Sequence, residues 1–212
     1  MKIAVMGATG MAGSRIAAEA ARRGHRVSGF SRSRCPIAEQ LVGVTLASAD
    51  ATDVEAMARI AEANEVIVLA TRPATGGESD VGAVVSRVLD SGLASGRRVI
   101  VIGGAGPLRS PDSPSRLVID DSRFVSNRWR ASAQASIDQL AACAAHGANW
   151  TYLSPPALFE PGTRTGRYRR GGTELLVDAH GVSRISAEDL ALAVVDEIEL
   201  PHDGGRHFTV AY

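Results

Sequence analysis

The sequence has little lysine and little cysteine, and each shortage excludes a kind of chemistry. Lys2 is the one lysine among the 23 basic residues. No lysine can therefore follow a glycine loop as in a Walker A motif, form a Schiff base in mid-chain or assist a catalytic tyrosine there. Cys35 and Cys143 have no metal-ligand spacing, so we expect reduced, packed thiols. No histidine or carboxylate cluster has such spacing either, and we expect no metal site.

The chain also lacks an excess of either charge and any long apolar run. Its 23 basic residues balance 23 acidic ones, whereas binding to nucleic acid or to an anionic membrane draws on a basic excess. We therefore expect a small-molecule substrate, with neither nucleic acid nor membrane as partner, and a monomer or homodimer. No apolar run approaches the roughly 18 to 20 residues of a membrane span, and the N-terminus turns glycine-rich too early for a signal peptide. These features favour a cytoplasmic location.

The first half of the chain alternates short aliphatic runs with alanine-rich segments. The length of 212 residues is typical of one domain, so we treat residues 1–212 as a single domain. Continuous aliphatic runs predict strands buried on both faces, at residues 2–6, 65–71 and 98–103. Weaker strands are predicted at 26–31 and 42–49, and helices at 11–23, 52–63 and 81–92. The alternation predicts an α/β fold with a doubly wound parallel sheet.

The helix predicted at 52–63 carries a capping signal. Thr52, followed three residues later by Glu55, forms a capping box. Its apolar face is predicted to hold Val54, Met57 and Ile60. We therefore expect Thr52 to cap this helix and that face to pack inward.

The second half is less regular. Residues 104–128 are polar and proline-bearing, and two interpretations stay open: a loop over the ligand crevice or a disordered segment. A helix at 129–146 and a strand at 149–154 follow. We take residues 155–185 as a small C-terminal, substrate-side insertion in the domain.

Within and after this insertion the turn signals predict a few short elements. Residues 174–178 and 183–185 suggest a hairpin around a turn at 180–181. Ser186 with Asp189 caps a last helix that ends before Pro201, and residues 206–212 read as a closing strand.

A glycine-spaced turn joins the first strand to the first helix. In GATGMAG, residues 7–13, Gly7 permits a tight turn, Gly10 lets the backbone approach a pyrophosphate, and Gly13 lets the helix pack closely on the strand. A bare strand-to-helix turn is the alternative, but an apolar strand before the turn and a helix after it favour dinucleotide binding. The residues predicted to hold the phosphates are Gly7, Thr9, Gly10, Met11 and Gly13.

The GATG core and several later segments carry a family resemblance. The core resembles extended and atypical short-chain dehydrogenase/reductases. The later segments resemble the NADH-flavin reductase family, which is NmrA-like and related to biliverdin/flavin reductases: VIGGAG at 101–106, WTYLSP at 150–155, FEPGTRTGRYR at 159–169, SRISAED at 183–189 and FTVAY at 208–212. The resemblance covers essentially the whole chain and implies an NAD(P)-binding Rossmann fold with flavin reductase activity. In similar proteins an acid and the next amide meet the adenine, which implies Asp50 and Ala51 here, and a proline such as Pro155 shapes the nicotinamide pocket.

The end of the second strand bears on the choice of dinucleotide. NAD-preferring Rossmann proteins place an acid there for the ribose hydroxyls, and this chain has none. A serine hydroxyl and guanidinium groups suit a 2′-phosphate, so we expect NADP(H) to be preferred over NAD(H), although the family name points to NADH and a solvated arginine pair is the alternative. The residues concerned are Ser31, Arg32 and Arg34.

Other strand ends should border the same cofactor, because ligands of open α/β sheets bind outside the carboxyl ends of the strands. The residues predicted there are Ala70, Thr71, Arg72 and Gly103. Arg72 can pair with a phosphate or simply with solvent, and Asp50 can cap the nearby helix instead of meeting the adenine.

The usual catalytic pair of short-chain dehydrogenases, a tyrosine and a lysine four residues later, is missing. There is no lysine beyond Lys2 and no tyrosine before Tyr152, which disfavours ordinary carbonyl reduction. A flavin or similar planar acceptor stabilises the developing charge itself, so alignment can suffice, and flavin would be a substrate rather than a prosthetic group. The catalytic residues stay unassigned, and the acceptor-site candidates are Gly104, Ser154, Phe159, Arg164 and Tyr168, with Arg164 able to meet a phosphate or carboxylate.

Two alternatives stay open at this point. A non-catalytic NADP(H) sensor of NmrA-like type fits the same fold. The chain also resembles sugar-nucleotide epimerases and dehydratases of the same superfamily, but the missing tyrosine and lysine disfavour that activity.

Overall fold

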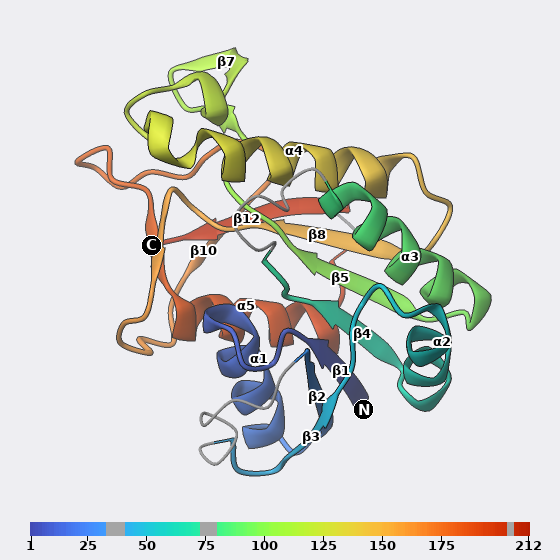
Figure 1. The fold of residues 1–212 in the computed structure, drawn as a ribbon. Helices are drawn as coiled ribbons and strands as arrows, with labels where there is room; N and C mark the ends of the chain where they lie inside the picture. The colour runs from blue at the N-terminus through green and yellow to red at the C-terminus, as the bar shows by residue number, and fades with distance from the viewer. Residues whose placement is uncertain (33–40, 73–79, 203–205) are drawn as a thin grey trace.

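A computed structural model describes residues 1–32, 41–72, 80–202 and 206–212. Its centre is an eight-stranded sheet in the order β10-β12-β8-β5-β4-β1-β2-β3 (Figure 1). Seven strands run parallel: β1 Lys2–Met6, β2 Arg26–Ser31, β3 Val44–Ser48, β4 Val66–Leu69, β5 Arg98–Ile102, β8 Trp150–Ser154 and β12 His207–Ala211. The edge strand β10, Arg169–Gly171, pairs antiparallel with β12. The predicted doubly wound α/β fold is confirmed.

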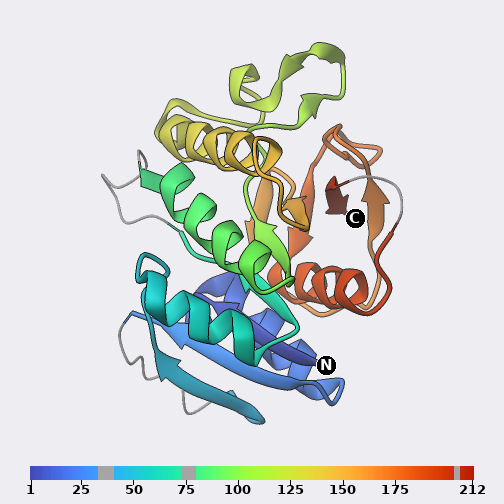
Figure 2. The same cartoon turned by 90° about the vertical axis from the view of Figure 1, so that its right-hand side faces the viewer.

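Helices cover both faces of the sheet. The two on one face are α1 Met11–Arg22 and α5 Ala187–Glu199, and the three on the other are α2 Val54–Ala63, α3 Val81–Ala94 and α4 Arg130–Ala144 (Figure 2). Each face buries its own cluster of aliphatic side chains, and every residue of β4 is buried. The continuous hydrophobicity of these strands therefore reflects burial on both sides.

The start of α2 corrects one prediction. Asp53, and not Thr52, is the N-cap, and its side chain accepts a hydrogen bond from Ala56 N at 3.0 Å. Thr52 instead donates its N–H and its hydroxyl to Asp50 Oδ1, both at 2.9 Å. The one-residue shift turns Val54 outward, where its exposed fraction is 65%, while the predicted inward residues Met57 and Ile60 are buried.

Residues 104–128 are folded, so disorder is excluded as their interpretation. They contain a hairpin of β6 Arg109–Ser110 and β7 Ser113–Leu117 and the 3-10 turns η3 Val118–Asp120 and η4 Asn127–Trp129. Buried Asp121 holds them together by accepting hydrogen bonds from Ser110 Oγ at 2.7 Å and Arg123 Nη2 at 2.7 Å. The hydrogen bonds from Arg123 have the largest effect on the pKa of Asp121 and, with the bond from Ser110, hold it well below its usual range.

The hairpin predicted at 174–185 is wrong. A turn is present, because Asp178 Oδ1 accepts from the amides of His180 at 2.8 Å and Val182 at 2.9 Å. The following strand, β11 Arg184–Ser186, however pairs in parallel with β9 Leu158–Glu160 rather than back on residues 174–178. Leu108, Val118 and Leu175 form a small core that joins the 104–128 segment to this insertion.

The start of α5 follows the prediction. Ser186 Oγ accepts a hydrogen bond from Asp189 N at 3.1 Å, which confirms the predicted cap. The closing strand is also present as β12.

Candidate functional site

The turn after β1 lies between the ends of β2 and β4. Gly7 N donates to Phe30 O at 2.8 Å, and Ala70 N donates to Met6 O at 2.9 Å. Gly7 has φ +83°, and a β carbon there would lie 2.6 Å from Ala70 O. Only glycine fits this position, since both the backbone angle and the close approach exclude a side chain.

The next two glycines set the start of α1. A β carbon on Gly13 would lie 2.1 Å from Gly7 O, so the helix can rest on the turn only without one. Exposed Gly10 is the N-cap, and a β carbon there would meet only Gly7 O, at 3.2 Å. No side chain caps α1 and its first turn holds no acid. With no side-chain cap on its N-cap residue, the first amides of α1 are left available to a diphosphate. Thr9 and Met11 lie half-buried in the same turn.

Arg32 and Asp50 lie together at the ends of β2 and β3. Ser31 pairs with Ser48 in the sheet, Ser48 Oγ donates to Arg32 O at 3.2 Å, and the Arg32 side chain is exposed. Hydrogen bonds from Thr52 lower the pKa of Asp50, and the charge of Arg32 lowers it further. An ionised carboxylate and a solvent-facing guanidinium thus stand where the adenosine end of a dinucleotide is expected. Arg34 lies outside the described residues.

Other predicted cofactor contacts line the same end of the sheet. Ala70 and Thr71 follow β4 directly beside Gly7 and are half-buried, and Ala51 is buried after β3. Arg72 is exposed and has no ion pair within the described part of the chain.

The glycines after β5 have a packing role that the sequence did not reveal. A β carbon on Gly103 would lie 1.8 Å from Tyr152 Oη, and one on Gly106 would lie 2.3 Å from Ala133 O in α4. Gly104 approaches the Ser136 side chain of the same helix. Tyr152 donates to Ser136 O at 2.8 Å, and burial raises the pKa of its phenol far above the usual value. These glycines let α4 and Tyr152 close over the end of β5.

Ser154 ends β8 next to buried Pro155. Its hydroxyl is fully buried and lies 2.9 Å from His207 Nε2 on β12. Burial lowers the pKa of His207 to about 4, so the imidazole is neutral near pH 7 and its Nε2 can accept a hydrogen bond from the Ser154 hydroxyl. We did not predict this pairing, because 53 residues separate its members.

The remaining acceptor-site candidates face the α1 and α5 layer. Arg164 donates to Glu19 of α1 from Nε at 3.2 Å and Nη2 at 3.0 Å. Tyr168 donates to Asp196 of α5 at 2.6 Å. Phe159 packs against the core beneath those helices. The structure therefore gives Arg164 a protein carboxylate in place of the expected substrate anion, and it bonds Tyr168 to Asp196 of α5.

Comparison with known sequences agrees with this geometry. The model of a family described as NAD(P)H-binding matches residues 7–201. The chain belongs to that NAD(P)H-binding family. The YwnB protein of Bacillus subtilis (strain 168) is 32% identical over 214 residues, which cover 99% of this chain and 98% of YwnB.

Solved structures of similar sequence share the fold of this NAD(P)H-binding protein over its whole length. A candidate exported protein from Burkholderia pseudomallei is 40% identical with a TM-score of 0.88, and 100% of each chain is covered. A candidate NADH-flavin reductase from Streptococcus pneumoniae TIGR4 is 25% identical with a TM-score of 0.86, covering 100% of this chain and 99% of that one.

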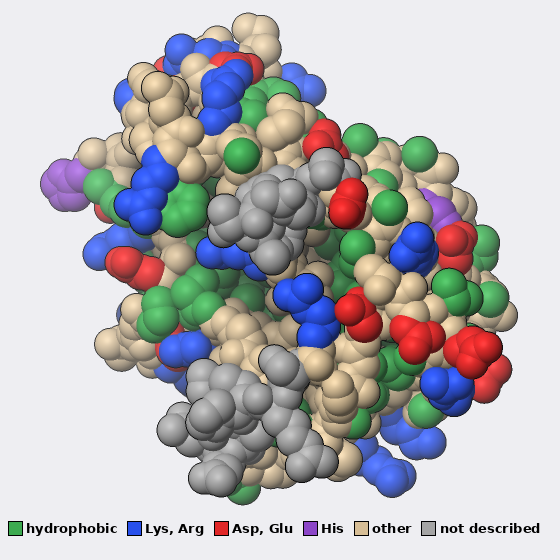
Figure 3. Space-filling model, viewed as in Figure 1, with side chains coloured by type: hydrophobic (Ala, Val, Ile, Leu, Met, Phe, Trp, Pro, Cys, Tyr) green, Lys and Arg blue, Asp and Glu red, His purple; other side chains and the backbone are tan. Residues whose placement is uncertain are grey.

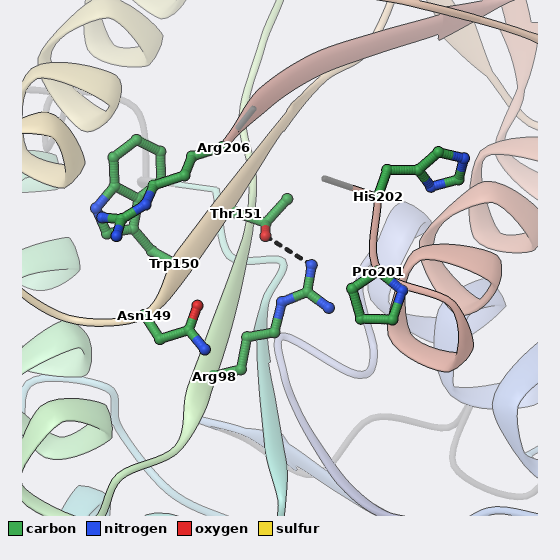
Figure 4. Close-up of a pocket in the computed structure, with 7 residues that line it drawn as sticks. All are labelled: Arg98, Asn149, Trp150, Thr151, Pro201, His202 and Arg206. Atoms are coloured by element: carbon green, nitrogen blue, oxygen red, sulfur yellow. Dashed lines mark hydrogen bonds between the residues drawn. The ribbon is translucent and has the colours of Figure 1, made fainter. Parts of the chain in front are cut away.

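A separate hollow of about 270 Å³ lies at the opposite end of the sheet of this NAD(P)H-binding protein (Figure 4). It is lined by the starts of β5 and β8, where Arg98 Nη2 donates to Thr151 Oγ1 at 2.8 Å, and by Pro201 and His202. Because the glycine turn stands at the carboxyl ends of the strands, this hollow is not the nucleotide site. None of the helices in the described ranges is both long and apolar enough to cross a membrane.

Proposed function

We propose that this protein is an NADPH-preferring reductase that passes hydride to a flavin or similar planar acceptor, with the flavin as a substrate. The supporting observation is that no tyrosine can serve as the proton donor of a carbonyl reductase. Tyr152, Tyr168 and Tyr212, the three tyrosines of the chain, donate to Ser136 O, to Asp196 and to Asp189 respectively. With no lysine nearby to lower a phenol pKa, the acceptor must stabilise its own developing charge.

The dinucleotide supplies the hydride when bound, and the chain supplies its position. The first amides of α1, beside Gly10, would bind the diphosphate, and Arg32 would pair with the 2′-phosphate. Gly104 and Pro155, which follow the ends of β5 and β8, would border the nicotinamide. The acceptor would gain two electrons and one proton as the hydride from NADPH, and a second proton from solvent.

The preference for NADPH rests on the end of β2. Arg32 is exposed, and its charge lowers the pKa of the neighbouring Asp50. The sequence directly after β2, Arg32 to Arg34, contains no acid. A 2′-phosphate would add a second acceptor for that guanidinium, whereas a ribose hydroxyl offers far less.

We also propose a cytoplasmic place of action, a small-molecule substrate and a monomeric or homodimeric state. The balanced charge of the chain supports the absence of a nucleic-acid partner. The name of the Burkholderia relative points instead to export, and fractionation of the native host cell would decide between the two locations.

The decisive experiment mixes purified protein with NADPH and FMN and follows the loss of reduced-nicotinamide absorbance. We expect turnover in the wild-type protein and none in Gly10→Val, which fills the diphosphate space. Tight NADPH binding without turnover of FMN, riboflavin or a quinone would contradict the proposal and indicate a dinucleotide sensor.

A further inference from the structure

The hollow at the starts of β5 and β8 plays no part in the proposed reductase function. Its volume of about 270 Å³ is slightly below that of pockets for drug-sized ligands, which begin at about 300 Å³. One water takes up roughly 30 Å³ in the liquid, so the space suits a small organic molecule better than a single ion. The side chains around it show what kind of molecule it would bind.

Two buried donors at this end of the sheet lack a hydrogen-bond partner. They are Trp150 Nε1 and Arg97 Nε, and no other buried side-chain nitrogen or oxygen in the described ranges is left unpaired. Trp150, which begins β8, is only 7% exposed and lines the hollow, while Arg97 directly precedes β5. Native structures seldom leave a buried N–H unpaired, so the indole N–H points to an acceptor that the chain does not supply.

A guanidinium lies over the same indole. Arg206 Cζ is 5.3 Å from the centroid of the Trp150 ring, and Figure 4 shows the two side chains lying together on one side of β8. Arg206 is exposed and forms no ion pair with any described residue. The one hydrogen bond of its side chain to the described chain runs from Nη1 to Ala148 O at 3.4 Å. Most of its N–H groups are therefore available to a ligand.

The other cations around the hollow share a single buried acid. Arg98 pairs with Glu197, which also accepts from Arg170 Nη1 at 2.8 Å and lies 3.3 Å from His202 Nδ1. None of the seven described residues that line the hollow is acidic. Acidic and basic side chains are interspersed on the face that Figure 3 shows, whereas this hollow carries positive charge alone. Such a lining favours a negatively charged ligand.

We propose that the hollow is a second ligand site, which binds a small organic anion through Trp150 and Arg206. An oxygen of the ligand's carboxylate or phosphate accepts the indole N–H, and the Arg206 guanidinium pairs with the same group. Exposed Asn149, at the rim, offers its amide to the rest of the molecule. The site is separate from the proposed dinucleotide site, because the glycine turn stands at the opposite end of the sheet.

The test follows the fluorescence of Trp150 with two probe anions, citrate and glycerol 3-phosphate. The titrations use Trp129→Phe, which leaves Trp150 as the only tryptophan of the chain. We expect at least one probe to change the emission saturably, and glycerol, the matched neutral compound, to leave it unchanged. A response to citrate alone assigns a carboxylate ligand, and a response to glycerol 3-phosphate alone assigns a phosphate.

Variants of the two binding residues locate the probe. Arg206→Gln should raise the Kd of the responding probe about tenfold, since a charge-assisted hydrogen bond is lost. Trp150→Phe removes the N–H but keeps an aromatic ring, and calorimetry should show a Kd raised about threefold or more. Arg59→Gln, at an exposed arginine of α2, is the matched control and should leave the Kd unchanged.

Three results would overturn this proposal. The first is the absence of a saturable response to either probe. The second is an unchanged Kd in Arg206→Gln or in Trp150→Phe. The third is a Kd that rises in Arg32→Ala but not in Arg206→Gln, which would place the probe in the proposed nucleotide site. Reduction of FMN by NADPH should be equal in the wild type and in Arg206→Gln, so this test does not depend on the reductase function.

Discussion

Gly13 of α1 approaches Gly7 of the preceding turn so closely that a β carbon at position 13 would lie 2.1 Å from Gly7 O. This contact fixes the axis of α1 relative to β1. The amides at the start of the helix therefore point to the carboxyl end of the sheet before any ligand arrives, and the site is preorganised.

The Gly13 contact predicts a loss of stability. Gly13→Ala should lower the free energy of unfolding by about 1 to 3 kcal/mol, since backbone atoms must move to admit the methyl group. Urea denaturation measures the effect. Gly147→Ala is the control, because no atom lies within 4 Å of a β carbon there. Equal stability of the two variants would show that α1 does not rest on the turn.

Gly10 gives the opposite prediction, a loss of binding with the fold retained. Its backbone is extended, with φ −79° and ψ 171°, which valine adopts readily. Gly10→Val should fold and yet lose the increase in melting temperature that NADPH gives the wild-type protein. In the wild type, NADPH at a hundred times its Kd should stabilise the folded state by about 2.7 kcal/mol. Gly147→Val should keep that increase. A normal NADPH shift in Gly10→Val would remove the diphosphate from this turn.

Arg32 should carry the preference for NADPH. Arg32→Ala is expected to weaken NADPH binding about tenfold and to leave NADH binding nearly unchanged, because a charge-assisted hydrogen bond contributes about 1.5 kcal/mol. Calorimetric titration with each nucleotide measures both constants. Arg59→Ala, at an exposed arginine of α2, serves as the control. An unaltered ratio of the two constants in Arg32→Ala would assign the 2′-phosphate to another residue.

His207 should make stability fall in mild acid. Burial lowers the pKa of His207 to about 4 from its usual 6.5, so between these values the unfolded chain binds a proton that the folded protein does not. The stability contributed by the neutral imidazole is therefore complete above pH 6.5 and is lost as pH falls toward 4. Denaturation curves between pH 6.5 and 4.5 should show a smaller loss for His207→Gln than for the wild type.

The pH range stops at 4.5 so that loss of the stabilisation contributed by buried carboxylates such as Glu19 does not add to the effect of His207. Burial opposes ionisation of Glu19, yet hydrogen bonds from Arg22, Arg164 and Arg23 outweigh it and lower the pKa to about 2. Its contribution is lost only below about pH 4.5. His180→Gln, on the exposed turn, is the matched control. Identical pH profiles for the wild type and His207→Gln would contradict the prediction.

Arg164 should act on stability and not on the acceptor. The side chain of Glu19 is only 6% exposed, and in Arg164→Ala it keeps its ion pairs with Arg22 and Arg23. We therefore expect the free energy of unfolding to fall by about 1 kcal/mol. Acceptor KM, measured in the same reductase assay, should not change. A large rise in KM with unaltered stability would restore Arg164 to the acceptor site.

The sequence by itself determined the features that depend on neighbours along the chain. Aliphatic runs specified the buried parallel strands, the spacing of Gly7, Gly10 and Gly13 specified the turn, and Ser186 specified the start of α5. Periodicity, backbone angles and caps act over a few residues, so a local pattern is enough to predict them. Even at this range the prediction for α2 was wrong by one residue, because Asp53 and the adjacent Thr52 can both cap a helix and Asp53 is the N-cap.

Only the tertiary structure decided which distant groups meet. Arg164 pairs with Glu19 across 145 positions, Ser154 pairs with His207, and β11 pairs with β9 rather than with the segment before it. Partners of this kind are chosen by how helices and strands pack, because a buried charge or hydroxyl takes whichever complementary group the packing leaves within about 3 Å. No spacing along the chain encodes that distance.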